Sequence, residues 1–275
     1  MRLGFIGTGN MGTVLIESLI TSKAVSDKTI GITNRTPEKA QPLLNKYPGI
    51  TYYHKLEKIV IESDILFFCV KQNDLFTILK QIKPYLSKNQ CYITLASAVT
   101  TEQLEAWFPA SWIRLIPSIT NRAMAGNFLI TFGKNCHPRW KKTVRALLEK
   151  VGNPIEIDDQ YLRIAADIAS CGPAFLSLLL QKMISAAVSK TNINKQFATE
   201  LASQMLIGTA KLLEKNHYTL QELQEKVLVK GGITGEGIKV LERGQLTELF
   251  EEVFTSTAEK ARKDAEEARI YFESE

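Results

Sequence analysis

Three glycines near the start of the chain have the spacing of a loop that binds a dinucleotide. They stand at positions 7, 9 and 12, after a short apolar run and before a stretch with helical periodicity. Such a turn lets the backbone approach a pyrophosphate and points helix amides at the anion. An ordinary glycine-rich turn is the alternative, but the strand before it and the helix after it favour the dinucleotide loop. The candidate cofactor-binding residues here are Gly7, Thr8, Gly9, Asn10, Met11 and Gly12.

The second predicted strand, residues 29–33, indicates which cofactor binds. In a protein that binds NAD, this strand ends at Asp or Glu, which accepts a hydrogen bond from the ribose 2′-hydroxyl. Here Asn34, Arg35 and Thr36 follow the strand instead. A guanidinium and a hydroxyl bind a 2′-phosphate, which an acid would repel. We therefore predict NADP(H) rather than NAD(H); the alternative is that Arg35 is a solvated charge and Thr36 a helix cap.

Further candidates follow the strands predicted at residues 65–70, 92–95 and 113–116. The carboxyl ends of parallel strands form the ligand edge of an open sheet. Lys71 could neutralise a phosphate there or lie on the surface, and the small residues 96–98 would let a nicotinamide ring approach the backbone. The candidate cofactor-binding residues at these strand ends are Cys69, Val70, Lys71, Ala96, Ser97 and Ser118.

The second half of the chain holds another glycine-rich segment. Gly231 and Gly232 precede a short predicted helix, so their amides could bind a carboxylate. Thr234 could cap that helix or direct its hydroxyl at a ligand. Residues 170–174, Ser-Cys-Gly-Pro-Ala, predict a flexible break at the start of another helix.

The elements that must position these residues alternate in the first half of the chain. Predicted strands cover residues 3–6, 29–33, 51–54, 65–70, 92–95, 113–116 and 129–132. Predicted helices cover residues 10–22, 37–46, 56–62, 75–86, 101–107 and 138–151. Apolar strands that alternate with helices indicate an α/β fold with a Rossmann-type, doubly wound parallel sheet.

The pattern changes after about residue 157, where strand signals stop. Helical patterns then cover residues 159–170, 173–190, 195–215, 220–228 and 247–272. The charges interleaved along the last helix are typical of a solvated face. We predict an NADP-binding Rossmann domain at residues 1–157 and an all-helical substrate and dimerisation domain at residues 158–275. The apolar start of the 173–190 helix needs a cover, either a partner subunit or the first domain.

Composition restricts the class of function. The net charge of +5 is spread along the chain without a basic block, so no nucleic-acid partner is expected. The four cysteines and three histidines are too scattered for a disulfide framework or a metal site. No apolar run reads as a membrane span and no signal peptide precedes the first strand, so we expect a cytoplasmic protein.

Jointly, these motifs resemble the pyrroline-5-carboxylate reductases, which make proline from a cyclic imine with NAD(P)H. The resemblance covers essentially the whole chain and implies a Rossmann domain followed by a helical domain that interlocks with a partner subunit. The matching segments, in family order and spacing, are residues 5–12, 34–36, 70–71, 114–117, 171–174 and 231–234. Residues 116–122 and 229–237 look like the divergent branch of the family that late-competence operons encode.

The departures from the family pattern are concentrated where the family binds substrate and nicotinamide. Val229 replaces the serine expected on the substrate carboxylate, Ile233 replaces a threonine, and Gln72 replaces a proline. Ser118 stands where the family has an asparagine, and Gln181 where an acidic residue is common. The substrate-binding residues that the resemblance implies are Cys171, Gly172, Val229, Lys230, Gly231, Gly232 and Thr234.

The resemblance implies NADPH-dependent reduction of 1-pyrroline-5-carboxylate to proline by hydride transfer to a C=N carbon. Thr234, the candidate catalytic residue, would hydrogen-bond the ring nitrogen, and no metal is needed. The expected partners are a small imino acid and a second copy of the chain, in a homodimer or a dimer-based oligomer. Two alternatives stay open: an NADP(H)-binding protein with an altered imine substrate or a non-catalytic role, and a β-hydroxyacid dehydrogenase that uses Lys182 or Lys190.

Overall fold

The computed structural model describes residues 1–274 and divides into two compact units. The first contains Met1–Cys171 together with Thr257–Glu275, and the second contains Gly172–Ser256. The first unit holds the whole sheet, and the second is built of helices, in the order that the sequence predicts. The boundary between residues 157 and 158 stays a prediction.

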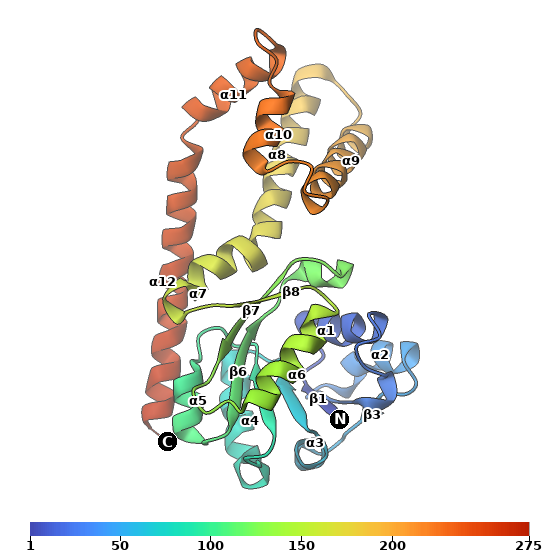
Figure 1. The fold of residues 1–275 in the computed structure, drawn as a ribbon, viewed down its shortest axis with the longest axis vertical. Helices are drawn as coiled ribbons and strands as arrows, with labels where there is room; N and C mark the ends of the chain where they lie inside the picture. The colour runs from blue at the N-terminus through green and yellow to red at the C-terminus, as the bar shows by residue number, and fades with distance from the viewer. Residues whose placement is uncertain (275) are drawn as a thin grey trace. The chain divides into compact units, whose positions relative to one another are not determined.

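The first unit is built on an eight-stranded sheet with the order β3-β2-β1-β4-β5-β6-β7-β8 (Figure 1). Its strands are β1 (Leu3–Ile6), β2 (Ile30–Thr33), β3 (Thr51–Tyr52), β4 (Ile65–Phe68), β5 (Cys91–Thr94), β6 (Ser111–Ile116), β7 (Asn127–Phe132) and β8 (Asn153–Glu156). The strand order reverses between β1 and β4, and a doubly wound sheet binds its ligand at that point. The predicted fold class is confirmed.

Two features of the sheet differ from the sequence patterns. Strand β7 runs antiparallel to β6, whereas the other neighbouring pairs are parallel. A parallel return needs a crossover of a dozen or more residues, and the connection from β6 to β7 is a short 3₁₀ turn at Ile119–Ala123. Strand β8 was not expected because Pro154 interrupts its pattern, which the sheet tolerates at its edge.

Helices cover both faces of the sheet (Figure 1). One face packs against α1 (Asn10–Thr21), α2 (Gln41–Lys46) and α6 (Pro138–Glu149). The other packs against α3 (Leu56–Glu62), α4 (Gln72–Ile82), α5 (Thr101–Trp107) and the end of α12 (Leu246–Glu273). The five central strands are therefore buried along their whole length, as parallel strands covered on both faces should be.

The packing of the end of α12 within the first unit was not predicted from the sequence. The ring of Tyr271 stacks on Phe76 of α4 with a centroid distance of 4.1 Å, and Ala268 is fully buried. Gln72 Nε2 donates a hydrogen bond to the carbonyl oxygen of Asp264 at 2.7 Å. Gln72, which replaces a family proline, therefore holds the last helix against the start of α4. Other charged side chains of this helix pair with one another, as the charge pattern predicts.

The second unit contains α8 (Gly172–Thr191), α9 (Lys195–Glu214), α10 (Leu220–Val227), α11 (Ile233–Arg243) and the start of α12. Helices α8 and α9 pack on each other through Ile184, Ala198 and Ala202. Many of their other apolar side chains are exposed in the single chain. This surface, which we call the α8–α9 apolar surface, consists of Leu176, Leu178, Leu179, Met183, Phe197, Leu201, Met205 and Ile207.

The predicted break at residues 170–174 is wrong. Helix α7 (Asp159–Ala166) continues through a π-helical turn, Asp167–Cys171, directly into α8. Pro173 has no N–H to complete an α-helical hydrogen bond, and a π turn accommodates the irregularity without ending the helix. Within residues 1–274, the resulting stretch Asp159–Thr191 is the one helix whose length and composition would suit a membrane span. A helix covered by a partner subunit has the same composition, so length and hydropathy do not distinguish the two.

Candidate cofactor and substrate site

The turn after β1 has the geometry that a bound pyrophosphate requires. Gly7 has a φ of +98°, and a Cβ there would lie 2.7 Å from the carbonyl oxygen of Cys69. A Cβ on Gly12 would overlap the carbonyl oxygen of Gly7, so only glycine lets α1 pack this closely on the turn. A Cβ on Gly9 would meet no atom within 4 Å. The three glycines therefore provide a tight turn, an open approach and close helix packing.

Polar groups of this turn are left over for a ligand. Thr8 is only 6% exposed, yet its hydroxyl has no hydrogen-bond partner in the described part of the chain. Gly9 is the N-cap of α1 and provides no side chain to cap the first helical amides. A buried hydroxyl and uncapped amides beside an open glycine fit the phosphates of a dinucleotide. Thr8, Gly9, Asn10 and Met11 are thus the residues that would hold the pyrophosphate.

Asn34 joins the two turns that surround this site. Its Oδ1 accepts a hydrogen bond from Thr8 N at 3.3 Å, and its Nδ2 donates one to the carbonyl oxygen of Thr36 at 3.0 Å. The hydroxyl of Tyr52 donates to the carbonyl oxygen of Asn34 at 3.3 Å. A carboxylate at this position would have no donor for Thr36. The residue that replaces the NAD-type acid is therefore a neutral amide with a bridging role.

Arg35 and Thr36 present the groups expected for a 2′-phosphate. The Arg35 side chain is 83% exposed, and its guanidinium pairs with Asp74 from the first turn of α4. Thr36 is the N-cap of the 3₁₀ turn Pro37–Ala40, but its hydroxyl makes no capping hydrogen bond. The structure therefore does not support the capping alternative for Thr36. Arg35 keeps donors beyond those that face Asp74, because a guanidinium carries five.

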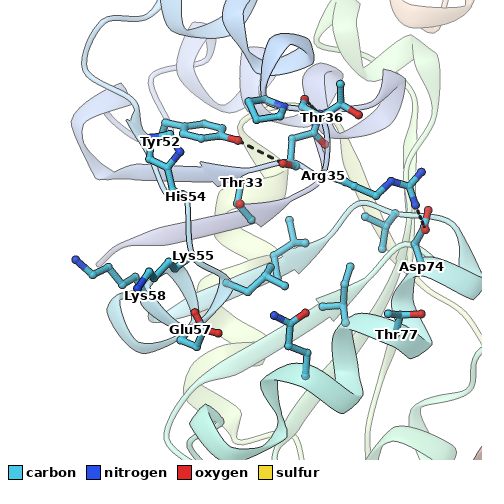
Figure 2. Close-up of a pocket in the computed structure, with 18 of the residues that line it drawn as sticks. Thr33, Arg35, Thr36, Tyr52, His54, Lys55, Glu57, Lys58, Asp74 and Thr77 are labelled. Carbon is cyan, nitrogen blue, oxygen red and sulfur yellow. Dashed lines mark hydrogen bonds and ion pairs between the residues drawn. The ribbon is translucent and has the colours of Figure 1, made fainter.

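A pocket of about 940 Å³ opens beside these residues, and all its lining residues belong to the first unit. Figure 2 shows Arg35 reaching toward Asp74 on one side of the pocket, with Lys55 and Lys58 on the opposite side. Polar and charged lining residues that were not predicted from the sequence include Lys39, Tyr52, His54, Lys55, Glu57, Lys58, Asp74, Thr77, Gln81 and Tyr85. Together with Arg35, the three lysines outnumber Glu57 and Asp74, so the lining has an excess of positive charge that suits an anionic dinucleotide.

A sequence signal for part of this pocket exists. Tyr52 ends β3 and His54 follows it, and the two rings lie 4.9 Å apart in an edge-on contact. In the Rossmann strand order, the third strand lies beside the second, so its carboxyl end borders the 2′-phosphate region. Asp74, in contrast, comes from the first turn of α4, and its approach to Arg35 depends on how α4 packs.

The residues at the end of β4 lie next to the glycine turn. Val70 lines the pocket, and Cys69 contributes the carbonyl oxygen that faces Gly7. Burial raises the pKa of the Cys69 thiol, which therefore stays protonated near neutral pH. Lys71 is exposed at the N-cap of α4 and has neither a capping bond nor an ion pair within residues 1–274. Its charge is therefore available to a phosphate, although it does not line the pocket.

The residues after β5 and β6 differ in accessibility. Ala96 is buried, whereas Ser97 is exposed in the turn after β5. Ser118 is 1% exposed, and its hydroxyl accepts a hydrogen bond from Thr120 Oγ1 at 2.9 Å. It also belongs to a capping box at the start of the following 3₁₀ turn. Ser97 is therefore the more accessible of the two predicted serine contacts.

The predicted substrate segment lies in the second unit, at the start of α11. Gly231 has a φ of +74°, and Gly232 is the N-cap without a side-chain capping bond. Gly232 N donates to the carbonyl oxygen of Val229 at 2.8 Å, so this amide, expected to be free for a carboxylate, is already engaged. Thr234 is exposed and makes no capping bond, which removes the capping alternative for its hydroxyl.

The two residues that depart from the family in this segment are solvent-exposed in the single chain. Val229 is 70% exposed and Ile233 is 94% exposed. Lys230 is exposed as well, with no ion pair in the described part of the chain. None of the three side chains contributes to the core of the second unit. Packing therefore does not constrain these residues, and they are accessible to a ligand or a partner.

Cys171 and Gly172 stand where the π turn meets α8. Arg163 Nη2 donates to Cys171 Sγ at 3.6 Å and to Asp167 at 2.7 Å. Asp167 is 1% exposed and also accepts a hydrogen bond from the hydroxyl of Thr257 at 2.7 Å. This cluster ties α7, the π turn and α12 together within the first unit.

The other thiols and the carboxylates give no sign of a metal centre. Burial raises the pKa of Cys91 well above its usual value and that of Cys136 to about 11. Thiols in that range are protonated near neutral pH and are weak nucleophiles and ligands. Among residues 1–274, no group of histidine, cysteine, aspartate and glutamate side chains is arranged to hold a metal ion.

Two sequence families match the chain. Residues 2–98 match the family described as NADP oxidoreductase, coenzyme F420-dependent. Residues 159–264 match the family described as pyrroline-5-carboxylate reductase dimerisation. The first match confirms NADP(H) as the predicted cofactor, and the second assigns a dimerisation domain to the helical half.

Relatives of known identity cover nearly the full length. ComE operon protein 4 of Bacillus subtilis is 48% identical over 272 residues, which span 99% of each chain. The pyrroline-5-carboxylate reductase of Staphylococcus aureus (strain COL) is 27% identical and spans 95% of this chain and 97% of its own. The crystal structure of Plasmodium falciparum pyrroline carboxylate reductase with NADP bound has the same fold, with a TM-score of 0.83 at 23% identity over 96% of this chain and 98% of that one.

These comparisons identify the family of the chain. The similarity to ComE operon protein 4 confirms the late-competence branch, and the dimerisation match assigns the helical half to the reductase family. The glycine turn and Asn34 lie within the residues that match the NADP oxidoreductase family, and the start of α11 lies within those that match the dimerisation family. The chain belongs to the pyrroline-5-carboxylate reductase family.

Proposed function

We propose that this protein reduces 1-pyrroline-5-carboxylate to proline with NADPH, in the cytoplasm and as a homodimer. One observation carries the proposal. The first amides of α11 have no side-chain cap, and the hydroxyl of Thr234 does not cap them. Both groups lie in the segment that matches the pyrroline-5-carboxylate reductase dimerisation family. The same chain has an NADP oxidoreductase domain with a basic pocket. The two features fit an anionic dinucleotide and an imino acid that carries a carboxylate.

The first unit binds the cofactor in this proposal. Bound NADPH supplies the hydride that adds to the carbon of the C=N bond. The turn after β1 binds the pyrophosphate, while Arg35 and Thr36 hold the 2′-phosphate. The turn after β5, where Ser97 is exposed, would border the nicotinamide. Most of the rate enhancement comes from holding the two reactants in contact, because a protonated imine is already electrophilic.

The start of α11 binds the substrate. Thr234 Oγ1 accepts a hydrogen bond from the protonated ring nitrogen and fixes the face of the imine that receives the hydride. The carboxylate is held by the amides of Gly231, Ile233 and Thr234, since the Gly232 amide is engaged with Val229. Helix amides without intrahelical partners are suited to a carboxylate. Lys230 adds a positive charge beside them.

The turnover of NADPH with 1-pyrroline-5-carboxylate tests the proposal. The absorbance of NADPH is followed over time with purified protein and the substrate, and NADH is tested in parallel as the hydride donor. We expect turnover that favours NADPH. Thr234→Ala should lower kcat by at least tenfold because the nitrogen loses its hydrogen bond, and Thr234→Ser should retain most of the activity. Thr199→Ala is the matched control, because the Thr199 hydroxyl donates a hydrogen bond to the Lys195 carbonyl oxygen within α9. Undiminished turnover by Thr234→Ala would contradict the role of that hydroxyl.

A second candidate function follows from the departures at the substrate segment. Val229 and Ile233 remove two hydroxyls that the family pattern places there, and ComE operon protein 4 is the 48% identical relative. On this alternative the protein binds NADP(H) but takes another imine or acts without catalysis. Tight NADPH binding together with no turnover on any cyclic imino acid would favour it over the reductase.

A further inference from the structure

A buried arginine that the proposed chemistry does not use lies beneath the turn after β5. Arg114 is on β6 and is only 3% exposed. Its Nη1 lies 3.3 Å from the carbonyl oxygen of Ser97 and 3.4 Å from that of Val99. Its Nη2 donates to Thr131 Oγ1 at 3.4 Å and pairs with Asp159. One guanidinium thus connects the turn after β5, strand β7 and the start of α7.

The carbonyl contacts determine how the turn presents its amides. The turn is closed by a hydrogen bond from Val99 N to the carbonyl oxygen of Ala96 at 3.2 Å. In a trans peptide the C=O and the next N–H point in opposite directions, and the described chain contains no cis peptide bond. Because Arg114 draws the Ser97 carbonyl inward, the N–H of Ala98 points away from the guanidinium. That N–H has no protein partner within residues 1–274.

Burying the charged guanidinium of Arg114 costs desolvation free energy, which indicates that the charge has a function. Burial lowers the pKa of the guanidinium, which the nearby carboxylates of Asp159 and Glu102 oppose. The Asp159 side chain is 42% exposed, and the Nε of Arg114 has no partner in the described part of the chain. An apolar side chain of similar length would fill the space at lower cost. What the guanidinium adds is directional hydrogen bonding to the carbonyl oxygens of Ser97 and Val99.

We propose that Arg114 is a positioning residue for the nicotinamide: it orients the Ser97–Ala98 peptide so that the Ala98 N–H donates to the carboxamide oxygen of the ring. The inference rests on the proposed placement of NADP(H) in the first unit and adds a recognition element for the reactive end of the cofactor. Arg114 itself touches neither the cofactor nor the substrate. It acts through the turn, and its effect is confined to ligands that carry a nicotinamide.

A pair of ligands isolates this effect without any turnover. Calorimetry measures the Kd of NADPH and of 2′-phospho-ADP-ribose, which lacks the nicotinamide, for each variant. For the native protein we expect NADPH to bind more tightly than the truncated ligand. In Arg114→Met the affinity for NADPH should fall by about three- to tenfold, the value of one hydrogen bond, while that for the truncated ligand is unchanged.

Two further variants keep the test decisive. Arg114→Lys retains the charge but cannot bridge both carbonyls and Asp159, so it should show the same selective loss, and it replaces Arg114→Met if that variant does not fold. Arg145→Met is the control, because Arg145 also binds a carbonyl oxygen and a carboxylate, those of Pro154 and Glu156, away from the turn. It should leave the ratio of the two affinities unchanged.

The possible outcomes separate this inference from the proposed function. An equal loss for both ligands would mean that Arg114 has a general structural role, and no change in either would mean that the turn needs no arginine; both results overturn the inference. Native protein that binds the two ligands equally well would overturn it as well. Native protein that binds neither ligand would refute the cofactor part of the proposed function instead.

Discussion

At the residue scale, the glycines of the turn after β1 have separable roles. Gly9→Ala adds a methyl group where no atom lies within 4 Å, so the fold should keep its stability. The methyl group would occupy the approach of the pyrophosphate, and NADPH affinity should fall by more than tenfold. Gly12→Ala should instead lower the free energy of unfolding by roughly 2 kcal/mol, because its Cβ would overlap the carbonyl oxygen of Gly7.

Urea unfolding and NADPH titration distinguish the two variants. Loss of stability in Gly9→Ala, or full stability in Gly12→Ala, would show that the roles of these positions are misassigned. The helical conformation of Gly12 and the extended conformation of Gly9 both suit alanine, so backbone strain does not complicate the comparison.

Cofactor selectivity at the residue scale depends on Arg35. Its replacement by alanine should weaken NADPH binding by about ten- to a hundredfold, the range for hydrogen bonds to a charged group, and leave NADH binding nearly unchanged. Titration of both cofactors measures the effect. Arg122→Ala is a suitable control, because Arg122 is an exposed arginine that pairs with Glu17 and does not line the pocket. Equal weakening of NADPH and NADH would contradict a 2′-phosphate contact.

At the element scale, the end of α12 contributes to the stability of the first unit. Tyr271→Ala removes a ring that stacks on Phe76 and a hydroxyl that donates to the Phe76 carbonyl oxygen at 3.0 Å. The free energy of unfolding should fall by about 2 kcal/mol. Ile270→Ala, one residue earlier and 57% exposed, should change it by less than about 0.5 kcal/mol. Urea denaturation of the full chain measures both, and equal effects would mean that the docking adds nothing.

Secondary structure was predictable at the element scale wherever the signal is local. The capping boxes at Thr100 and Thr219 are formed by the neighbours that the sequence places three residues on. The π turn at Asp167–Cys171 was not predictable, because the continuity of α7 into α8 depends on contacts beyond the Gly-Pro pair. One such contact is the hydrogen bond from the Ser170 hydroxyl to the carbonyl oxygen of Pro117 at 2.9 Å.

At the scale of the whole molecule, the α8–α9 apolar surface should be covered by a second copy of the chain. Leu178 is 54% exposed and Leu201 is 50% exposed in the single chain. The double variant Leu178→Glu/Leu201→Glu should be monomeric by sedimentation velocity, since a buried carboxylate without a partner is strongly unfavourable. Ile61→Glu, on α3 and 63% exposed, should leave the native assembly intact. A dimer that survives the double variant would place the interface elsewhere.

The surroundings of the substrate segment, residues 229–234, depend on the assembly of the protein. Val229, Lys230 and Ile233 are exposed in the single chain, so their side chains are accessible to a ligand or a partner and do not pack in the core. From the sequence, these positions stand out only through the family pattern. Their physical environment could not be predicted, because exposure depends on which surfaces the assembled protein covers.

The sequence by itself determined the Rossmann fold, the glycine turn and the preference for NADP(H). These follow from short-range signals: glycine spacing, strand and helix periodicity, and the residues that directly follow a strand. Only the tertiary structure decided that Asn34 bridges two turns, that Asp74 meets Arg35 and that Arg114 holds the turn after β5. Each of these contacts joins residues from different elements, and their approach is set by the packing of those elements rather than by local sequence.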